Sequence, residues 1–300
     1  MKMHSIPAVA VALAMAAGPV RAQSTIDATD KFAWSANTGW VNFRPSAADG
    51  VVVGEKFLSG FAWGANTGWI HMGDGTPLNG HTYSNASATD FGVNHDGAGS
   101  FSGFAYSANT GWINFGWASL NDPNRPRFDL ITGNFTGFAW GANTGWLNLG
   151  AGFLHTDQIL CLDTDRDGMG DAWESQHFGN LTTAGLNTDK DKDAQSDAAE
   201  YVADTNPNDP GEFLRIVSQT YPPNLTSVTL TFSTTRPTRL YRIQESTTLL
   251  STGPGAWADV RELGTFAADP RSSTTKTFTL PAGTRPRHFL RVVVVKPLQP

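Results

Sequence analysis

The sequence predicts a mainly β, multidomain protein with an N-terminal β-hairpin repeat array, a short linker that contains helices, and a C-terminal β-sandwich. Three observations lead to this prediction. A twelve-residue motif rich in aromatic residues occurs four times in the first half of the chain. A dense run of acidic residues follows it, and the last ninety or so residues alternate short apolar runs with turn-forming residues.

Charge is distributed unevenly over the 300 residues, which carry a net charge of −6. Residues 23–154 contain 9 acidic and 5 basic residues, residues 155–211 contain 13 and 3, and residues 212–300 contain 5 and 11. Three charge regimes favour three modules with boundaries at these positions. The acidic middle module needs nearby positive charge, which metal ions supply best at short range.

Residues 1–22 have the features of a signal peptide. Lys2 provides the positive start, residues 6–17 are apolar, and Val20, Arg21 and Ala22 form a small-x-small cleavage pattern. The alternative is an N-terminal membrane anchor, although the apolar run is short for a spanning helix. We expect a mature chain that begins near Gln23, has no transmembrane segment and is secreted, extracellular or held at the cell surface.

The repeated motif begins with the sequence FAWSANTGWVNF at residues 32–43 and returns at residues 61–72, 104–115 and 138–149. Each copy reads as a β-hairpin, because Ala-Asn-Thr-Gly forms a turn between two apolar runs. Large residues on both strand faces indicate that both faces are at least partly covered. Short apolar stretches at residues 50–59, 92–102 and 127–136 predict a third strand before each of the last three copies. The assembly could be propeller-like, prism-like or stacked.

The repeated tryptophans allow two interpretations. Aromatic side chains bury large areas and dominate the packing of small β modules, so a core role is the favoured interpretation. The alternative is a platform of exposed rings that stack on sugars, and four copies would then form a multivalent surface.

The acidic stretch begins with a twelve-residue loop of the kind that binds calcium. Carboxylates stand at loop positions 1, 3, 5, 9 and 12, with Gly168 at the sharp turn of position 6. Calcium takes six to eight hard oxygen ligands, and this spacing brings them to one point. The expected ligands, with a backbone carbonyl from the methionine, are Asp163, Asp165, Asp167, Met169, Asp171 and Glu174.

A second loop repeats this spacing. Its expected calcium ligands are Asp189, Asp191, Asp193, Gln195, Asp197 and Glu200. Position 6 holds Ala194 instead of glycine, and an alanine with positive φ is strained by roughly 1 kcal/mol. The second site should therefore bind more weakly or be less regular.

Each loop leads into a short helix, giving half of an EF-hand. The first is expected over residues 171–178, ended by Gly179, and the second over residues 196–203. We expect a minimal core between them from Trp173, Phe178, Tyr201 and Val202. Cys161, the sole cysteine, cannot form an internal disulfide and reads as a small buried residue.

Residues 163–210 resemble the tandem calcium-binding repeats of thrombospondin type 3 and dockerin-like modules. They are especially similar to a linker of large secreted bacterial proteins, through FGNL at residues 178–181 and EYVADTNPNDP at residues 200–210. The resemblance implies extracellular calcium binding and a rigid spacer rather than catalysis. Ala194 and Asn206 depart from the pattern and weaken the expectation for the second site. The FAW repeats are also similar to repeats in such proteins, without a function that can be transferred.

The C-terminal module should contain six short strands, near residues 213–217, 227–232, 239–244, 257–260, 276–280 and 288–295. Strands of this length with turn-rich connections are typical of a β-sandwich. The YRIQES segment at residues 241–246, with Trp257 and the FLRV segment at residues 289–292, resembles the fibronectin type III-like modules that follow such calcium linkers.

The leading hypothesis is a calcium-binding structural or adhesive protein with no enzymatic activity and no nucleic-acid partner. Its partners would be polysaccharides or proteins of the cell surface or extracellular space. The alternative is a lectin-like protein that binds carbohydrate through the repeat tryptophans. The sequence contains neither an HExxH zinc motif nor a GxSxG nucleophile motif, which argues against common hydrolases.

Overall fold

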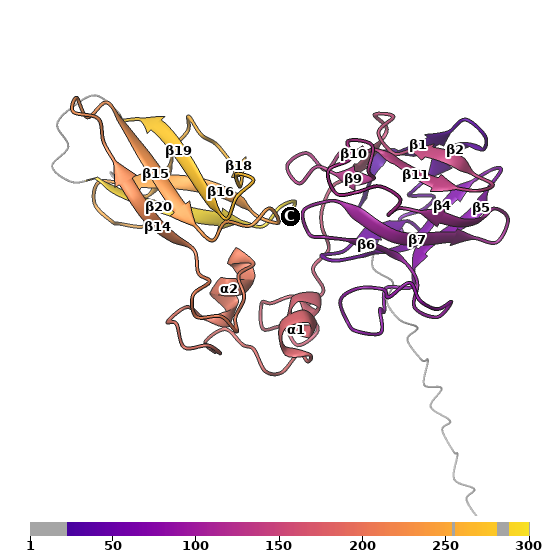
Figure 1. The fold of residues 1–300 in the computed structure, drawn as a ribbon, viewed down its shortest axis with the longest axis horizontal. Helices are drawn as coiled ribbons and strands as arrows, with labels where there is room; N and C mark the ends of the chain where they lie inside the picture. Colours follow the sequence, from indigo (N-terminus) through magenta and orange to yellow (C-terminus); the bar gives the residue numbers. More distant parts are fainter. Residues whose placement is uncertain (1–22, 254–255, 281–287, 300) are drawn as a thin grey trace, which may run out of the picture.

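The computed structural model describes residues 23–253, 256–280 and 288–299, and it is mainly β (Figure 1). The predicted signal peptide lies outside the described residues. Within them, no helix is both long enough and apolar enough to span a membrane. A β-barrel-like sheet from the first half of the chain lies on one side of Figure 1. A pair of smaller sheets from the last third lies on the other, and the helices lie below both.

The four copies of the motif form four β-hairpins that join into one closed sheet. Each copy contributes two strands: β1 (Ile26–Ser35) with β2 (Gly39–Asn42), β4 (Leu58–Gly64) with β5 (Gly68–Gly73), β7 (Phe101–Ser107) with β8 (Gly111–Asn114), and β11 (Phe138–Gly141) with β12 (Gly145–Asn148). Neighbouring hairpins pair antiparallel, β2 with β4, β5 with β7 and β8 with β11. The last strand, β12, pairs with β1 and closes the ring.

The narrow interior of the closed sheet explains why each copy of the motif has an alanine between two large aromatic residues. The alanine of each first strand faces a branched residue of the second, as in the pairs Ala33 with Val41 and Ala105 with Ile113, and all four residues are fully buried. A small closed sheet has a narrow interior, and alternation of small and large residues fills it. The phenylalanine and tryptophan that flank each alanine therefore point outward.

The exposure of the tryptophans shows that the core interpretation is wrong. The seven repeat tryptophans are each 41% to 51% exposed, and Tyr106, in the equivalent position of the third copy, is also exposed. The alternation of large and small residues was recognised, but the sequence did not reveal that the alanine side faces inward. These eight rings, which we call the aromatic belt, lie on the outer face of the closed sheet: Trp34, Trp40, Trp63, Trp69, Tyr106, Trp112, Trp140 and Trp146.

Additional strands pair with the closed sheet, as expected for two of the three apolar stretches that precede a copy of the motif. Strand β3 (Val51–Val53) pairs with β4, and β6 (Val93–His95) pairs with β7. Before the fourth copy, β9 (Arg127–Phe128) and β10 (Phe135–Thr136) instead form a separate two-stranded sheet. Strand β13 (Leu154–Thr156) crosses the expected module boundary at residue 154 and pairs with β1, which provides an extra strand for the first copy.

Within the described residues, the acidic segment contains the two helices, α1 (Asp171–Phe178) and α2 (Asp197–Ala203), close to the expected ranges. Gly179 ends α1 in a left-handed conformation, and Ser196 caps α2 by accepting the N–H of Ala199. A small core forms around Trp173 and Tyr201. Its buried members are Met169, Trp173, Ala184 and Tyr201, with Phe178 partly buried against them. Val202 was expected in this core but is 40% exposed.

The last third of the described chain forms two antiparallel sheets. One contains β14 (Arg215–Thr220), β15 (Ser227–Ser233) and β19 (Ser273–Thr279). The other contains β16 (Leu240–Ser246), β17 (Ala258–Asp259), β18 (Phe266–Ala267) and β20 (Phe289–Val295). Both sheets contribute to one apolar cluster that includes Phe232, Tyr241 and Phe278. The two-residue strand β18 was not expected from the sequence.

The end of the chain returns to the closed sheet after β20 (Figure 1). Leu298 packs against the closed-sheet core, and its carbonyl accepts the N–H of Ile159 at 3.1 Å. The first and last parts of the chain are therefore in direct contact, beside the acidic segment.

Candidate metal centre

The first acidic loop is held in shape by its own carboxylates. Asp163 accepts the N–H of Arg166 at 2.7 Å through one oxygen and the N–H of Gly168 at 3.0 Å through the other. Asp167 accepts the N–H of Met169 at 2.9 Å. These short-range hydrogen bonds fold the loop, and they leave side-chain oxygens of Asp163, Asp165 and Asp167 within 4.8 Å of one another.

The second loop reproduces this arrangement position by position. Asp189 accepts the N–H groups of Lys192 at 2.7 Å and Ala194 at 3.1 Å, and Asp193 accepts the N–H of Gln195 at 2.7 Å. Side-chain oxygens of Asp189, Asp191 and Asp193 also lie within 4.8 Å of one another. Two loops of different sequence thus converge on the same geometry.

The backbone shows why position 6 prefers glycine. Gly168 has a φ of 94°, and Ala194, at the same position of the second loop, has a φ of 76°. Only glycine adopts such values without strain, so the alanine costs about 1 kcal/mol. The expectation that Ala194 has positive φ is confirmed.

The last carboxylate of each loop comes from the following helix and is buried. The side chain of Glu174 is 0% exposed, and within the described residues neither of its carboxylate oxygens has a hydrogen-bond partner. Glu200 is buried too; one oxygen accepts a hydrogen bond from Thr205 at 3.2 Å, and the other has no partner in the described chain. An unpaired buried carboxylate is costly, because burial removes the water that stabilises its charge.

Further unpartnered oxygens share this environment. Within the described residues, one buried oxygen of each of the following carboxylates has no hydrogen-bond partner: Asp167, Asp191, Asp193 and Asp197. A divalent cation satisfies such a set, because it replaces mutual repulsion with attraction at short range. The residues therefore fit a metal ion in each loop.

Position 9 differs between the loops. Both oxygens of Asp171 accept hydrogen bonds from Thr164, at 2.7 Å from its N–H and 2.6 Å from its hydroxyl. In the second loop, one oxygen of Asp197 accepts the N–H of Lys190 at 3.0 Å. Because ligands at this position often act through a water molecule, Asp171 can still contribute in that way. Sequence reasoning did not single out Thr164 or Thr205, since a threonine beside an acidic loop carries no distinctive signal.

Met169 and Gln195, at position 7, were expected to offer backbone carbonyls. The Met169 side chain is buried in the core with Trp173, which anchors the first loop to α1. Gln195 is exposed, so this anchor is missing from the second loop. A third group, formed by Asp27, His155 and Asp157, could also hold a metal ion, but its members lie too far apart in the sequence to form a recognisable ligand spacing.

Without a metal ion, the buried glutamates hold protons unusually well. Burial raises the pKa of Glu174 to about 7, and the neighbouring charge of Asp167 adds to the effect. Burial likewise raises the pKa of Glu200 to about 7, assisted by Asp191. A cation in either loop would oppose both causes and keep the carboxylate ionised.

The stability of the metal-free protein should therefore fall as pH rises. Both glutamates have an ordinary pKa of 4.5 and a folded-state pKa of about 7, so the folded state binds more protons between these values. This proton-linked stabilisation is fully present below about pH 4.5 and is lost by about pH 7. Melting temperatures of chelator-treated, dialysed protein at about pH 5 and about pH 8 would measure it. In excess calcium the trend should reverse, and an unchanged trend would contradict the assignment.

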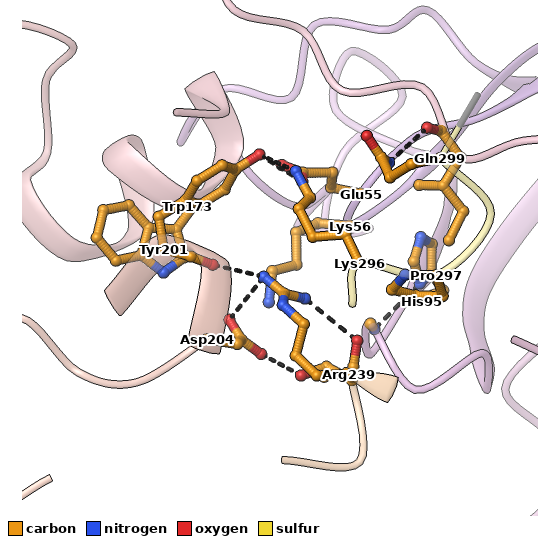
Figure 2. Close-up of a pocket in the computed structure, with 13 residues that line it drawn as sticks. Glu55, Lys56, His95, Trp173, Tyr201, Asp204, Arg239, Lys296, Pro297 and Gln299 are labelled. Carbon is orange, nitrogen blue, oxygen red and sulfur yellow. Dashed lines mark hydrogen bonds and ion pairs between the residues drawn. The ribbon is translucent and has the colours of Figure 1, made fainter. Parts of the chain in front are cut away.

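The acidic segment also makes polar contacts with both β-rich parts of the chain (Figure 2). The Tyr201 hydroxyl, next to Glu200 in sequence, donates to Glu55 from the loop after β3 at 2.8 Å. Lys296, after β20, lies 3.0 Å from the same carboxylate and also contacts the Tyr201 hydroxyl. Cys161 lies 2.9 Å from that hydroxyl and is only partly buried; burial raises the pKa of its thiol.

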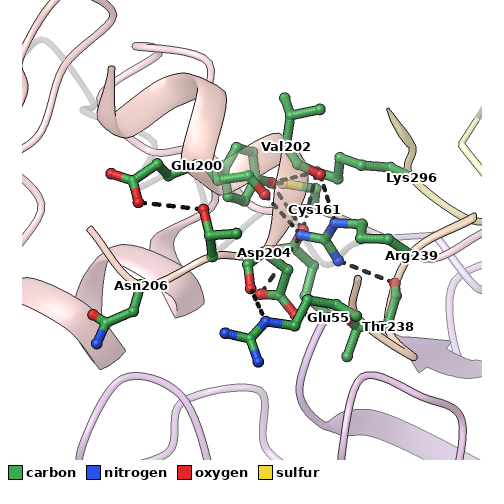
Figure 3. A network of polar contacts seen from close by, with 12 residues as sticks. Glu55, Cys161, Glu200, Val202, Asp204, Asn206, Thr238, Arg239 and Lys296 are labelled. Atoms are coloured by element: carbon green, nitrogen blue, oxygen red, sulfur yellow. Dashed lines mark hydrogen bonds and ion pairs between the residues drawn. The ribbon is translucent and has the colours of Figure 1, made fainter. Parts of the chain in front are cut away.

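The carboxyl end of α2 is held by Arg239 (Figure 3). Its guanidinium donates to the carbonyls of Val202 and Tyr201, each at 2.8 Å, and lies 3.8 Å from the Asp204 carboxylate. A cation at the carboxyl end of a helix is favourable because it satisfies the terminal carbonyls and complements the helix dipole. The helix that supplies Glu200 to the second loop therefore also contacts the C-terminal sheets.

Comparison with protein-family models, curated proteins and solved structures found no match. The function must therefore be inferred from the geometry of the acidic loops and of the surfaces around them.

Proposed function

We propose that the chain is a secreted or cell-surface calcium-binding structural or adhesive protein, in which calcium rigidifies the spacer between two β modules. The observation that carries this proposal is the pair of acidic loops, in each of which several buried carboxylate oxygens have no hydrogen-bond partner in the described chain. We take the spacer to be of the thrombospondin type 3 or dockerin-like kind and the C-terminal sheets to be a fibronectin type III-like sandwich.

The donor set favours calcium over other metals. The predicted ligands of both loops are carboxylate and carbonyl oxygens, which suit hard cations, while zinc and copper prefer nitrogen or sulfur. The irregular loop and the six expected protein ligands favour calcium over magnesium, which keeps most of its waters and needs near-octahedral geometry. At millimolar calcium, a site with a dissociation constant of about 10⁻⁴ M stabilises the folded state by about 1.4 kcal/mol.

Calcium would stiffen the spacer because the last two ligands of the second loop and the inter-module contacts belong to the same short helix, α2. Glu200 supplies the last ligand, while Tyr201 and Val202 contact the closed sheet and Arg239. Without the ion, repulsion between Glu200 and the loop aspartates should loosen α2 and, with it, these contacts.

Small-angle X-ray scattering of the chain lacking residues 1–22 tests this role. In millimolar calcium we expect a compact particle, and in excess chelator an increase in the radius of gyration as the two β modules separate. The double variant Glu174→Gln with Glu200→Gln should give the same scattering curve in calcium and in chelator, because each loop loses its last carboxylate and with it the repulsion that calcium relieves. The matched variant Glu262→Gln, whose carboxylate lies in the turn between β17 and β18 and accepts the N–H of Thr279, should behave like the parent chain. Identical scattering curves with and without calcium would refute the spacer role.

A second candidate function, carbohydrate binding, is supported by the exposure of the aromatic belt. Trp34 pairs with Trp40 across the strands of its hairpin, and the equivalent residues pair in the other three copies. Belt residues of adjacent hairpins are linked through a polar residue, as where Asn42 pairs with Trp63. Soluble monomeric proteins seldom expose so many large rings in a regular array without a binding role.

A further inference from the structure

One part of the aromatic belt is hollowed into a pocket. It has a volume of about 270 Å³ and is lined by Trp117, Asn124, Phe138 and Trp146. The ring centres of Trp117 and Trp146 lie 4.8 Å apart with their planes at 65°, so the two indoles form a corner. Phe138 supports Trp146 from the first strand of the fourth copy, at 6.3 Å and 78°. We call this site the fourth-copy corner.

The corner is held in place by hydrogen bonds rather than by packing alone. The indole N–H of Trp117 donates to the carbonyl of Phe138 at 2.6 Å, and the N–H of Phe138 donates to the carbonyl of Asn124 at 2.9 Å. The buried Arg125 side chain ties the same loop to the carbonyls of Ala118 and Phe101. A preformed site of this kind loses little conformational entropy when a ligand binds.

The other copies pack this position differently. In the first copy the equivalent Trp40 contacts Phe153 at 5.7 Å, and in the third copy Trp112 contacts Phe91 at 5.0 Å. In all three copies the contacting ring comes from a segment outside the repeat. In the fourth copy this ring is a tryptophan, whose indole N–H fixes its orientation, and this feature distinguishes the corner from the two other copies.

We propose that the fourth-copy corner binds one pyranose unit of a neutral polysaccharide. This proposal deepens the second candidate function and rests on it. One face of a pyranose presents weakly positive C–H groups, which match the negative face of an exposed indole such as Trp146. The exposed Asn124 carboxamide offers both donors and an acceptor, which suit neighbouring sugar hydroxyls; within the described residues its side chain has no hydrogen bond. The polar group in the lining is uncharged, which favours a neutral sugar over an acidic sugar or a cation.

Affinity electrophoresis of the calcium-loaded chain through gels containing soluble glucans, mannans, xylans or galactans tests the corner. We expect at least one polysaccharide to retard the protein. The variants Trp117→Ala and Trp146→Ala should lose at least about tenfold in affinity, and Asn124→Ala several-fold, with unchanged near-ultraviolet circular dichroism outside the indole contribution. The variant Leu120→Ala, which removes an exposed side chain from the segment that carries Trp117, should bind like the parent chain.

The remaining outcomes distinguish sugar binding at the fourth-copy corner from sugar binding along the whole aromatic belt. An equal loss in Trp69→Ala, in the second copy, whose neighbouring hairpins in the closed sheet are those of the first and third copies, would overturn the corner while leaving carbohydrate binding by the belt intact. Competition by choline would also overturn it, because an aromatic corner that prefers a quaternary ammonium is a cation site. If none of the polysaccharides retards the parent chain, the result refutes both the proposed sugar site at the corner and the second candidate function.

Discussion

Replacing Glu174 by glutamine is expected to change the stability of the protein in opposite directions with and without calcium. In the metal-free protein at neutral pH, the variant should be more stable, because it removes a buried carboxylate that faces Asp167 and Asp165. In calcium it should be less stable, because the loop loses its last anionic ligand. We expect the affinity of the first site to fall by on the order of 100-fold, about 2.8 kcal/mol. Thermal melting at neutral pH, in excess chelator and in millimolar calcium, measures both effects.

The matched control is Glu262→Gln, a change of the same size and charge in the turn between β17 and β18. It should shift the melting temperature equally in chelator and in calcium, since Glu262 accepts a hydrogen bond from Thr279 and lies in neither loop. A Glu174→Gln variant with the same sign of effect under both conditions would contradict the role of Glu174 as a metal ligand.

The second large effect is expected in the closed sheet, where Gly103→Ala should destabilise the fold by about 3 kcal/mol. Gly103 has a φ of 81°, and an added Cβ would lie 2.3 Å from the carbonyl oxygen of Gly92. Gly60 and Gly137 occupy the same place before Phe-Ala in their copies, with φ of 82° and 83° and carbonyl oxygens at 2.3 and 2.1 Å. The repeated glycine thus allows the backbone just before a neighbouring strand to approach closely. Urea unfolding followed by tryptophan fluorescence measures the loss, since eight of the ten tryptophans lie in residues 23–154.

Gly39→Ala separates the two causes of the destabilisation expected in Gly103→Ala, which are backbone strain at positive φ and the close contact of the added Cβ. Gly39 also has a positive φ, 80°, but an added Cβ there would meet nothing within 4 Å. It should therefore show only the backbone strain, about 1–2 kcal/mol. Equal losses for the two variants would mean that the close approach in the third copy does not contribute.

The local structure was predictable because each signal lies within a few neighbouring residues. The Ala-Asn-Thr-Gly turns produced four hairpins, and Gly179 ended α1 at the expected place. Closure of the sheet was not predictable, because the pairing of Trp34 with Asn148 joins residues that are far apart in sequence. The repeat pattern is equally consistent with propeller-like, prism-like or stacked arrangements until that contact is known.

The wrong expectation that the repeat tryptophans lie in the core has a similar physical origin. Alternation along Phe-Ala-Trp defines two faces of a strand but does not say which face is inside. The hydrophobicity of tryptophan suggested that its side of the strand is buried. The narrow interior instead contains the alanine of the first strand and large apolar residues of the second strand. The width of the interior, a global property of the closed sheet, decides the outcome.

The aspartate cluster of each acidic loop was predictable, because its residues follow a fixed spacing within one short segment. The structure brings together Asp163, Asp165 and Asp167, and likewise Asp189, Asp191 and Asp193, and it buries both closing glutamates. The partners that connect the segment to its surroundings could not be found in this way. Glu55 and Lys296 are ordinary charged residues in the sequence, and only the folded chain brings them to Tyr201.

Calorimetric titration of the metal-free chain with calcium tests the central proposal most directly. We expect two ions bound per chain, with the weaker step at the second loop because of the strain at Ala194, and a single remaining ion in Glu174→Gln. Titration without heat, or a stoichiometry that does not change when Glu174 and Glu200 are replaced, would contradict it.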